Sequence, residues 1–115
     1  METQNLKDKR PIIGIYEQII KDALPNAMIE YVSNFDDDYQ GWEITPAPGI
    51  LIKLMIEMDD SMIIKILLYK MDTYYGELRV KDVYSGTIPC TENSEPDYKF
   101  IQTILKNWMY FGHKK

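Results

Sequence analysis

Residues 50 to 71 constrain the fold more than any other part of the chain. They read ILIKLMIEM, DDS and MIIKILLYKM, two apolar runs joined by a short acidic turn. One face of the two runs consists of Ile50, Ile52, Leu54, Ile56, Met58, Met62, Ile64, Ile66 and Leu68. Because side chains alternate between the two faces of a strand and β-branched residues favour sheets, the segment predicts a two-stranded hairpin.

Helices are predicted on both sides of this hairpin. Residues 11–25 place an apolar stripe at helical spacing, with Pro11 in the first turn and Pro25 as the stop. Residues 96–112 place a second stripe, which ends at Gly112. Ser94, three residues before Asp97, resembles a capping box for this second helix.

The remaining strands complete the predicted fold class. Strands are expected at 27–35, 42–45 and 75–83, and in the last of these Leu78 and Val80 should face the core. The result is an α+β domain: an antiparallel, meander-like sheet of four to five strands, flanked by an N-terminal and a C-terminal helix. At 115 residues we expect a single domain over 11–112, a polar N-terminal tail at 1–10 and a basic C-terminal tail at 113–115.

The second face of the hairpin is also largely apolar. It carries Leu51, Met55, Leu67, Tyr69 and Met71. Apolar side chains clustered on an exposed surface usually mark a contact. Either the two helices cover opposite faces of the sheet, or part of this face pairs with another chain, which would be a second copy in a homodimer or a different partner.

Strand counting predicts an acidic edge. In a meander, alternate connections lie at the same end of the sheet, so the connections at 33–41, 59–61 and 85–95 should share one end. That end would carry Asp36, Asp37, Asp38, Asp59, Asp60, Glu92 and Glu95. The opposite end, with the turns at 46–49 and 72–75, would carry only Asp72.

The charge limits the partners. The chain has 13 basic and 18 acidic residues, a net charge of −5, and removing the two tails leaves a body of net charge −8. An acidic body repels phosphate backbones, which disfavours direct nucleic-acid binding by this part. Charged residues interrupt the apolar run at 50–71, so no membrane span is expected. A polar start (METQNLKDKR) and the single cysteine, Cys90, favour a cytoplasmic location.

No catalytic residue, metal or cofactor is expected. Asp36 and Asp38 alternate as in a calcium loop, but residue 47 is Ala where the closing Glu should stand. One Cys and one His cannot make a zinc site. Cys90 precedes acidic residues rather than the electropositive setting of a reactive thiol, and His113 lies in the basic tail. A solvated acidic turn is the favoured interpretation of the aspartates.

Two aromatic residues flank the DDD segment. Tyr39 and Trp42 are of the types that interface hot spots favour. The alternative for Trp42 is that it begins a strand and is buried.

In general character the chain resembles small acidic bacterial or phage proteins that neutralise a toxin or a defence enzyme, such as immunity proteins and anti-CRISPR proteins. The resemblance comes from size, acidity, a single domain and the lack of catalytic motifs, and it assigns no residue a role. It implies a non-enzymatic inhibitor.

The leading hypothesis is therefore an acidic edge that docks on a basic protein surface, such as that of a nuclease or toxin. The proposed contacts are Asp36, Asp37, Asp38, Asp59 and Asp60, with Tyr39 and Trp42 as apolar anchors. The alternatives are a small-molecule-binding domain with a pocket between helix and sheet, and an assembly or homodimer domain built on the second face of the 50–71 hairpin.

Overall fold

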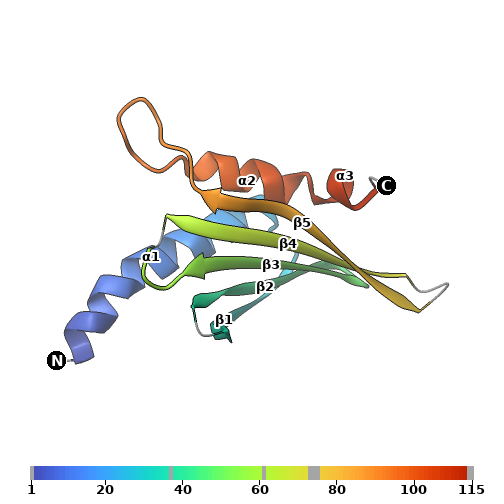
Figure 1. Cartoon of the computed structure of the whole chain (residues 1–115), viewed down its shortest axis with the longest axis horizontal. Coiled ribbons are helices and arrows are strands. Elements are labelled where there is room, and N and C mark those ends of the chain that lie inside the picture. The colour runs from blue at the N-terminus through green and yellow to red at the C-terminus, as the bar shows by residue number, and fades with distance from the viewer. Residues whose placement is uncertain (1, 37, 61, 73–75, 114–115) are drawn as a thin grey trace.

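A computed structural model of the chain describes residues 2–36, 38–60, 62–72 and 76–113 (Figure 1). Side chains are described for residues 13–35, 38–60, 62–71 and 76–110. The elements in chain order are α1 (Glu2–Ala23), β1 (Met28–Asp36), β2 (Tyr39–Ala47), β3 (Ile50–Glu57), β4 (Ile63–Asp72), β5 (Glu77–Thr87), α2 (Tyr98–Lys106) and α3 (Trp108–His113).

The five strands form one antiparallel sheet in the order β1-β2-β3-β4-β5. Each strand pairs with the next one along the chain, so the sheet is a meander and the predicted α+β class is confirmed. In the central pair, Leu54 lies opposite Ile66 and Ile56 opposite Ile64, which aligns the isoleucine-rich faces of both strands. The predicted hairpin at 50–71 is therefore present.

Both helices pack on the same face of the sheet. The Tyr16 ring of α1 lies 5.9 Å from the Trp42 ring of β2 and 5.6 Å from the Tyr98 ring of α2. Figure 1 shows α1 and α2 behind the strands, in one layer. The core between the layers consists of Tyr16, Ile19, Ile20, Ala23, Trp42, Ile44, Ile52, Leu54, Ile56, Ile64, Ile66, Leu68, Ile88, Ile101 and Leu105. The possibility that the helices cover opposite faces is excluded, because neither lies on the other face.

The helix boundaries differ from the prediction in three respects. The helix α1 begins at Glu2, within the segment expected to be a polar tail, because residues 2–10 are mostly good helix formers. The single helix expected at 96–112 is divided at Asn107, and α3 extends to His113. The capping box is absent: Asp97 is the N-cap of α2 and makes no side-chain capping hydrogen bond.

The strand boundaries also differ. The strand β2 begins at Tyr39 and ends at Ala47, so it is longer than the predicted 42–45 segment, and the DDD connection is correspondingly short. The strand β5 continues to Thr87, so the first residues of the predicted 85–95 loop are in the sheet.

The prediction that Leu78 and Val80 face the core was wrong. They are 56% and 53% exposed. A bulge in β5 is the reason: Tyr84 pairs with Ile66 and Asp82 with Leu67, so Val83 is an extra residue between two pairs. One extra residue in a strand moves every side chain beyond the bulge to the opposite face of the sheet from the one that simple alternation predicts. Val80 therefore lies opposite Tyr69, and Leu78 opposite Met71, on the face away from the helices.

Replacement of two glycines by alanine should change the free energy of unfolding in opposite directions. A Cβ on Gly41 would lie 1.9 Å from the Leu54 carbonyl oxygen on the neighbouring strand, whereas a Cβ on Gly14 would have no atom within 4 Å. We expect Gly41→Ala to lower the free energy of unfolding by about 1–3 kcal/mol, because backbone must shift. Gly14→Ala in α1 should raise it by up to about 1 kcal/mol. Urea denaturation measures both, and a stable Gly41→Ala variant would contradict the β2–β3 register.

Tyr16 predicts alkaline sensitivity. Burial raises the pKa of its hydroxyl above the usual range, and the neighbouring Tyr98 raises the pKa further. In the unfolded chain the Tyr16 hydroxyl loses its proton near pH 10, whereas in the folded protein it keeps the proton to higher pH. Just above pH 10, therefore, loss of this proton stabilises the unfolded state alone. The contribution of the Tyr16 hydroxyl to the free energy of unfolding is complete below about pH 10 and is lost as the pH rises above that value. In thermal unfolding between about pH 9 and 11, Tyr16→Phe should lose less stability than the wild type. An equal loss in both proteins would contradict the burial of this hydroxyl.

Candidate functional site

Two backbone hydrogen bonds join three connections at one end of the sheet. The Met58 amide, after β3, donates to the Asp38 carbonyl in the β1–β2 turn over 2.8 Å. The Ile88 amide, after β5, donates to the Met62 carbonyl in the β3–β4 turn over 2.8 Å. The strand-counting prediction is confirmed for the described residues: these connections lie side by side.

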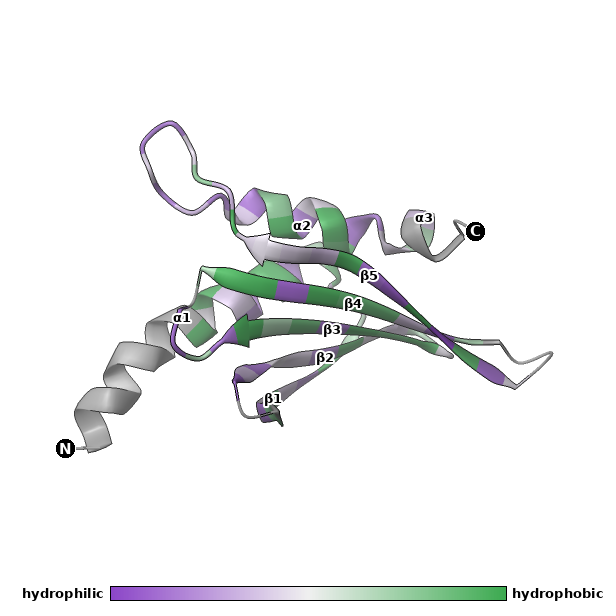
Figure 2. Cartoon of the chain, viewed as in Figure 1, coloured by the Kyte–Doolittle hydropathy of each residue, from purple (hydrophilic) through white to green (hydrophobic). Residues whose placement is uncertain are grey.

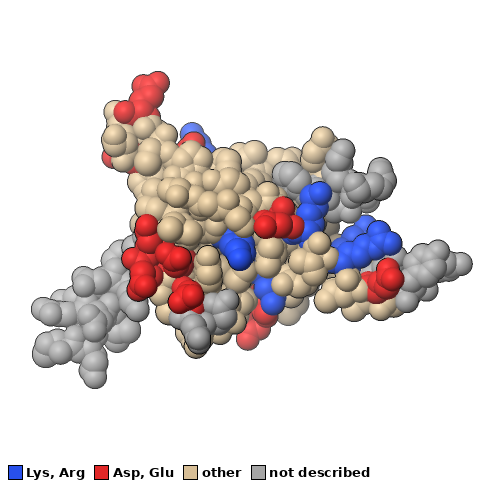
Figure 3. Space-filling view, viewed as in Figure 1, with Lys and Arg blue, Asp and Glu red and all other residues tan. Residues whose placement is uncertain are grey.

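Carboxylates gather at this end. Asp38, Asp59 and Asp60 are exposed, and Glu57, which ends β3 and pairs with Tyr39, is partly exposed. From here on, the name acidic edge refers to these four residues rather than to the larger set predicted from the sequence. Figure 3 shows a group of acidic side chains at the end of the sheet beside α1, whereas the middle and the other end carry basic side chains together with further acidic ones.

The sequence reasoning missed one member of the acidic edge and named others that the structure leaves undescribed. The sequence reasoning assigned Glu57 only to a strand face. Its position two residues before Asp59 could have indicated that it lies at the acidic end of the sheet. The side chain of Asp36 and the whole of Asp37 lie outside the described residues. Glu92 and Glu95 are exposed in the loop after β5.

Asp60 has a structural role in its turn. Its Oδ1 accepts a hydrogen bond from the Met62 amide over 3.0 Å, and its carbonyl accepts one from the Ile63 amide over 3.0 Å. An aspartate that bonds to the backbone two residues on mimics a backbone turn. Asp59 is its exposed neighbour on the same turn, so the two carboxylates differ in structural context while carrying the same charge.

The two predicted aromatic anchors have different locations. Tyr39 is half-buried, with the Lys65 Nζ 5.5 Å from its ring centroid, next to the acidic edge. Trp42 is 0% exposed, so its prediction as a partner anchor was wrong and the buried alternative is correct. Trp42 alternates in step with Ile44, which places both on the helix-covered face. The indole Nε1 donates to Glu17 Oε2 over 3.3 Å.

The face away from the helices, which we call the open face, ends in an apolar patch. The patch consists of Leu51, Tyr69, Met71, Leu78 and Val80, at the opposite end of the sheet from the acidic edge. Four of these, with Lys53, Ile50 and Gly49, line a shallow hollow of about 380 Å³. Figure 2 shows hydrophobic residues along most of β4 and hydrophilic residues in the loop after β5.

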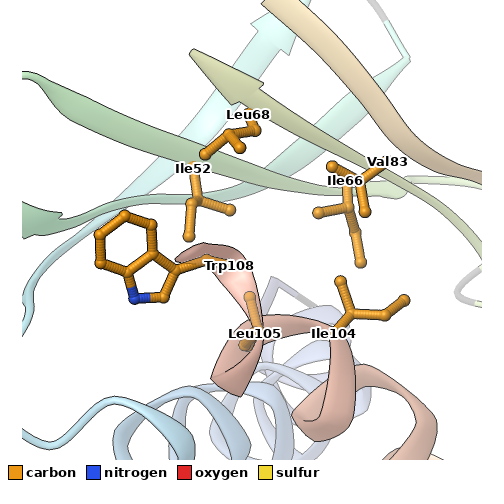
Figure 4. A pocket seen from close by; sticks show the side chains of 7 residues that line it. All are labelled: Ile52, Ile66, Leu68, Val83, Ile104, Leu105 and Trp108. Atoms are coloured by element: carbon orange, nitrogen blue, oxygen red, sulfur yellow. The ribbon is translucent and has the colours of Figure 1, made fainter. Parts of the chain in front are cut away.

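The space between sheet and helices contains a small cavity. Its volume is about 10 Å³, and its lining is wholly apolar: Ile52, Ile66, Leu68, Val83, Ile104, Leu105 and Trp108 (Figure 4). A space of this size is at the lower limit for one water molecule. It is a packing gap rather than a preformed pocket for a metabolite.

The remaining residues singled out by sequence are dispersed. Cys90 is a free, exposed cysteine, and its backbone pairs with that of Pro96 in a single antiparallel β-bridge. His113 ends α3, and its side chain lies outside the described set. Among the residues that the structure describes, no group of three or more His, Cys, Asp or Glu side chains is arranged to hold a metal ion. Within the same residues, no helix combines the length and apolarity needed to cross a bilayer.

Comparisons with protein-family models, with curated proteins and with solved structures found no match to this chain.

Asp59 and Asp60 provide a matched test of the turn. Asp60→Ala should lower the free energy of unfolding by about 0.5–1.5 kcal/mol, because the Met62 amide loses its acceptor. Asp59→Ala makes the same change in charge and should alter stability by no more than about 0.5 kcal/mol. Chemical denaturation at neutral pH compares them. Equal effects would show that charge, not the turn hydrogen bond, sets the contribution of Asp60.

Proposed function

We propose that this protein is a non-enzymatic binding protein whose acidic edge docks on a basic protein surface and blocks it. The observation that carries the proposal is the hydrogen bond between Met58 and Asp38, which joins the two aspartate-bearing turns into one surface. A surface built from two turns is more defined in shape than a single acidic loop, and shape is what a specific partner requires in addition to charge.

The charge distribution supports the same proposal. Carboxylates that share one end of the sheet add their fields, whereas the cations Lys53 and Lys65 lie on the open face, with their ammonium groups over Tyr69 and Tyr39 respectively. An edge with an excess of carboxylates attracts an oppositely charged patch from a distance and raises the association rate by about 10–10³-fold. The nucleic-acid groove of a nuclease is a basic surface of the kind that this edge would fit.

Tyr39 supplies the apolar component of the proposed contact. It is partly exposed beside Glu57, its partner in the β2–β3 register, and its ring is flat enough to cover a partner's aliphatic or guanidinium group. The proposed contact set is thus Asp38, Tyr39, Glu57, Asp59 and Asp60. Trp42 is removed from it because it lies in the core.

The test compares the wild type with the variant Asp38→Asn, Asp59→Asn, Asp60→Asn. Asparagine retains an acceptor for the Met62 amide, so the turn is preserved while three charges are removed. The wild-type protein is used to capture its partner from an extract of its source cells, and the association rate of the purified pair is then measured by stopped flow. At low salt the variant should associate at least about tenfold more slowly, and the difference should shrink as salt increases.

The control removes three charges elsewhere: Glu30→Gln, Glu43→Gln, Glu77→Gln. It has the same net charge as the test variant but keeps the acidic edge, so it should associate at nearly the wild-type rate. Equal slowing by both variants would show that only net charge matters and would refute a docking edge. A captured partner that retains full activity in the complex would refute the blocking role.

A further inference from the structure

We propose that one end of the molecule docks on the surface of an anionic lipid membrane, with the acidic edge pointing away from the lipid. This end consists of α3 and the part of the β4–β5 hairpin farthest from the acidic edge, and Figure 1 shows both on the side of the molecule opposite the N-terminus. We call it the basic end. The inference does not rest on the proposed function, because no residue of the acidic edge takes part in the contact.

Cations are concentrated at the basic end of an otherwise acidic chain. The segments 68–83 and 106–115 contain six Lys and Arg residues against three carboxylates, Asp72, Glu77 and Asp82. The rest of the chain contains seven Lys and Arg residues against 15 Asp and Glu residues. The charge of the protein is therefore strongly polarised, and an anionic surface attracts one end of it.

The fold brings these cations together from separate elements. Lys70 on β4 lies opposite Arg79 on β5. Lys81 lies opposite Leu68, so the alternation of side chains places Lys81 on the same face as Lys70 and Arg79. Lys106 ends α2 immediately before the short connection to α3, and α3 packs near β4. The cationic side chains of the basic end that the structure describes as exposed or partly exposed are Lys70, Arg79, Lys81 and Lys106.

Exposed apolar side chains accompany the cations. Met109 and Tyr110 on α3 are 55% and 65% exposed. Met71, Leu78 and Val80, from the apolar patch, are exposed on the strands of the same end. Five of the eight exposed large apolar residues in the described part of the chain thus lie here. Apolar and tyrosine side chains beside basic ones are typical of surfaces that lie in the headgroup region of a bilayer.

This combination favours a lipid surface over other occupants. A second copy that docked through the same end would bring cations against cations. A nucleic acid would pair with the cations but leave the apolar side chains in water. A membrane with anionic headgroups matches both features, because the headgroups attract the cations and the acyl boundary accepts the apolar side chains. Such a contact needs no membrane-spanning segment, since only side chains enter the lipid.

The net charge of −5 does not prevent this contact. The strand β4 is 10 residues long and runs from the β3–β4 turn to the basic end, so roughly 30 Å separates the acidic edge from the lipid. At physiological ionic strength, exposed charges are screened over about 8 Å. The membrane is therefore attracted by the cations nearest to it and is hardly repelled by the acidic edge.

Cosedimentation of the whole chain with lipid vesicles tests the proposal. The vesicles contain phosphatidylcholine with about 30% phosphatidylserine, or phosphatidylcholine alone. The wild type should bind the anionic vesicles at least about tenfold more tightly than the neutral ones, and added salt should weaken the binding. The double variant Lys81→Gln, Lys106→Gln should bind anionic vesicles at least about tenfold more weakly, because each cation near the surface contributes about fivefold in affinity.

The matched control is the double variant Lys9→Gln, Lys99→Gln. It has the same net charge, but Lys9 lies near the N-terminus of α1 and Lys99 in the first turn of α2, away from the basic end. It should bind as the wild type does.

The apolar part of the contact has its own pair of variants. Leu78→Ser with Val80→Ser should weaken binding to anionic vesicles, whereas Ile15→Ser, at an exposed position of α1, should not. All three positions are more than one-third exposed, so the variants should fold, and circular dichroism checks this.

Three results would overturn the proposal: a wild type that does not bind anionic vesicles, equal weakening by the two lysine pairs, or tighter binding to a DNA duplex than to the vesicles. The variant Asp38→Asn, Asp59→Asn, Asp60→Asn should bind vesicles at least as well as the wild type, so failure of the docking edge and failure of the membrane contact are separate outcomes.

Discussion

The burial of one isoleucine-lined sheet face beneath two helices is the interaction on which the rest of the structure depends. Ile52 and Leu54 on β3 and Ile64 and Ile66 on β4 are almost fully buried, and they meet Ile20 of α1 and Leu105 of α2 in a single cluster. Helix and sheet each hide one apolar surface in this way, which is the usual basis of a two-layer domain. Because both helices are used on one side, the other side must be stabilised by its own side chains or by a partner.

The same arrangement separates two surfaces along the sheet. The meander brings the β1–β2 and β3–β4 turns together, and the hydrogen bond from Met58 to Asp38 joins them into the acidic edge. The bulge at Val83 exposes Leu78 and Val80 at the other end.

Much of the fold follows from local pattern, and the errors have physical causes. The alternation of Ile52, Leu54 and Ile56 identified the buried face, and short connections made the meander the simplest order. The facing of Leu78 and Val80 could not be predicted, because alternation is the same on either face and a bulge leaves no reliable mark in one sequence. Trp42 could have been placed by its alternation with Ile44. Whether two apolar helices share a face depends on tertiary packing, which neither stripe encodes alone.

The most direct test of one-sided coverage is a nuclear Overhauser map of the methyl groups in isotope-labelled protein. The account predicts cross-peaks that connect the methyls of Ile20 and Leu105, in the helices, to the methyls of Ile52, Leu54 and Ile66, in the sheet, since these residues share one core. Methyls of Leu51 and Leu67 should show no cross-peak to either helix, because both residues lie on the open face. Cross-peaks from Leu51 or Leu67 to α1 or α2 would contradict the account, because a helix would then cover the face described here as open.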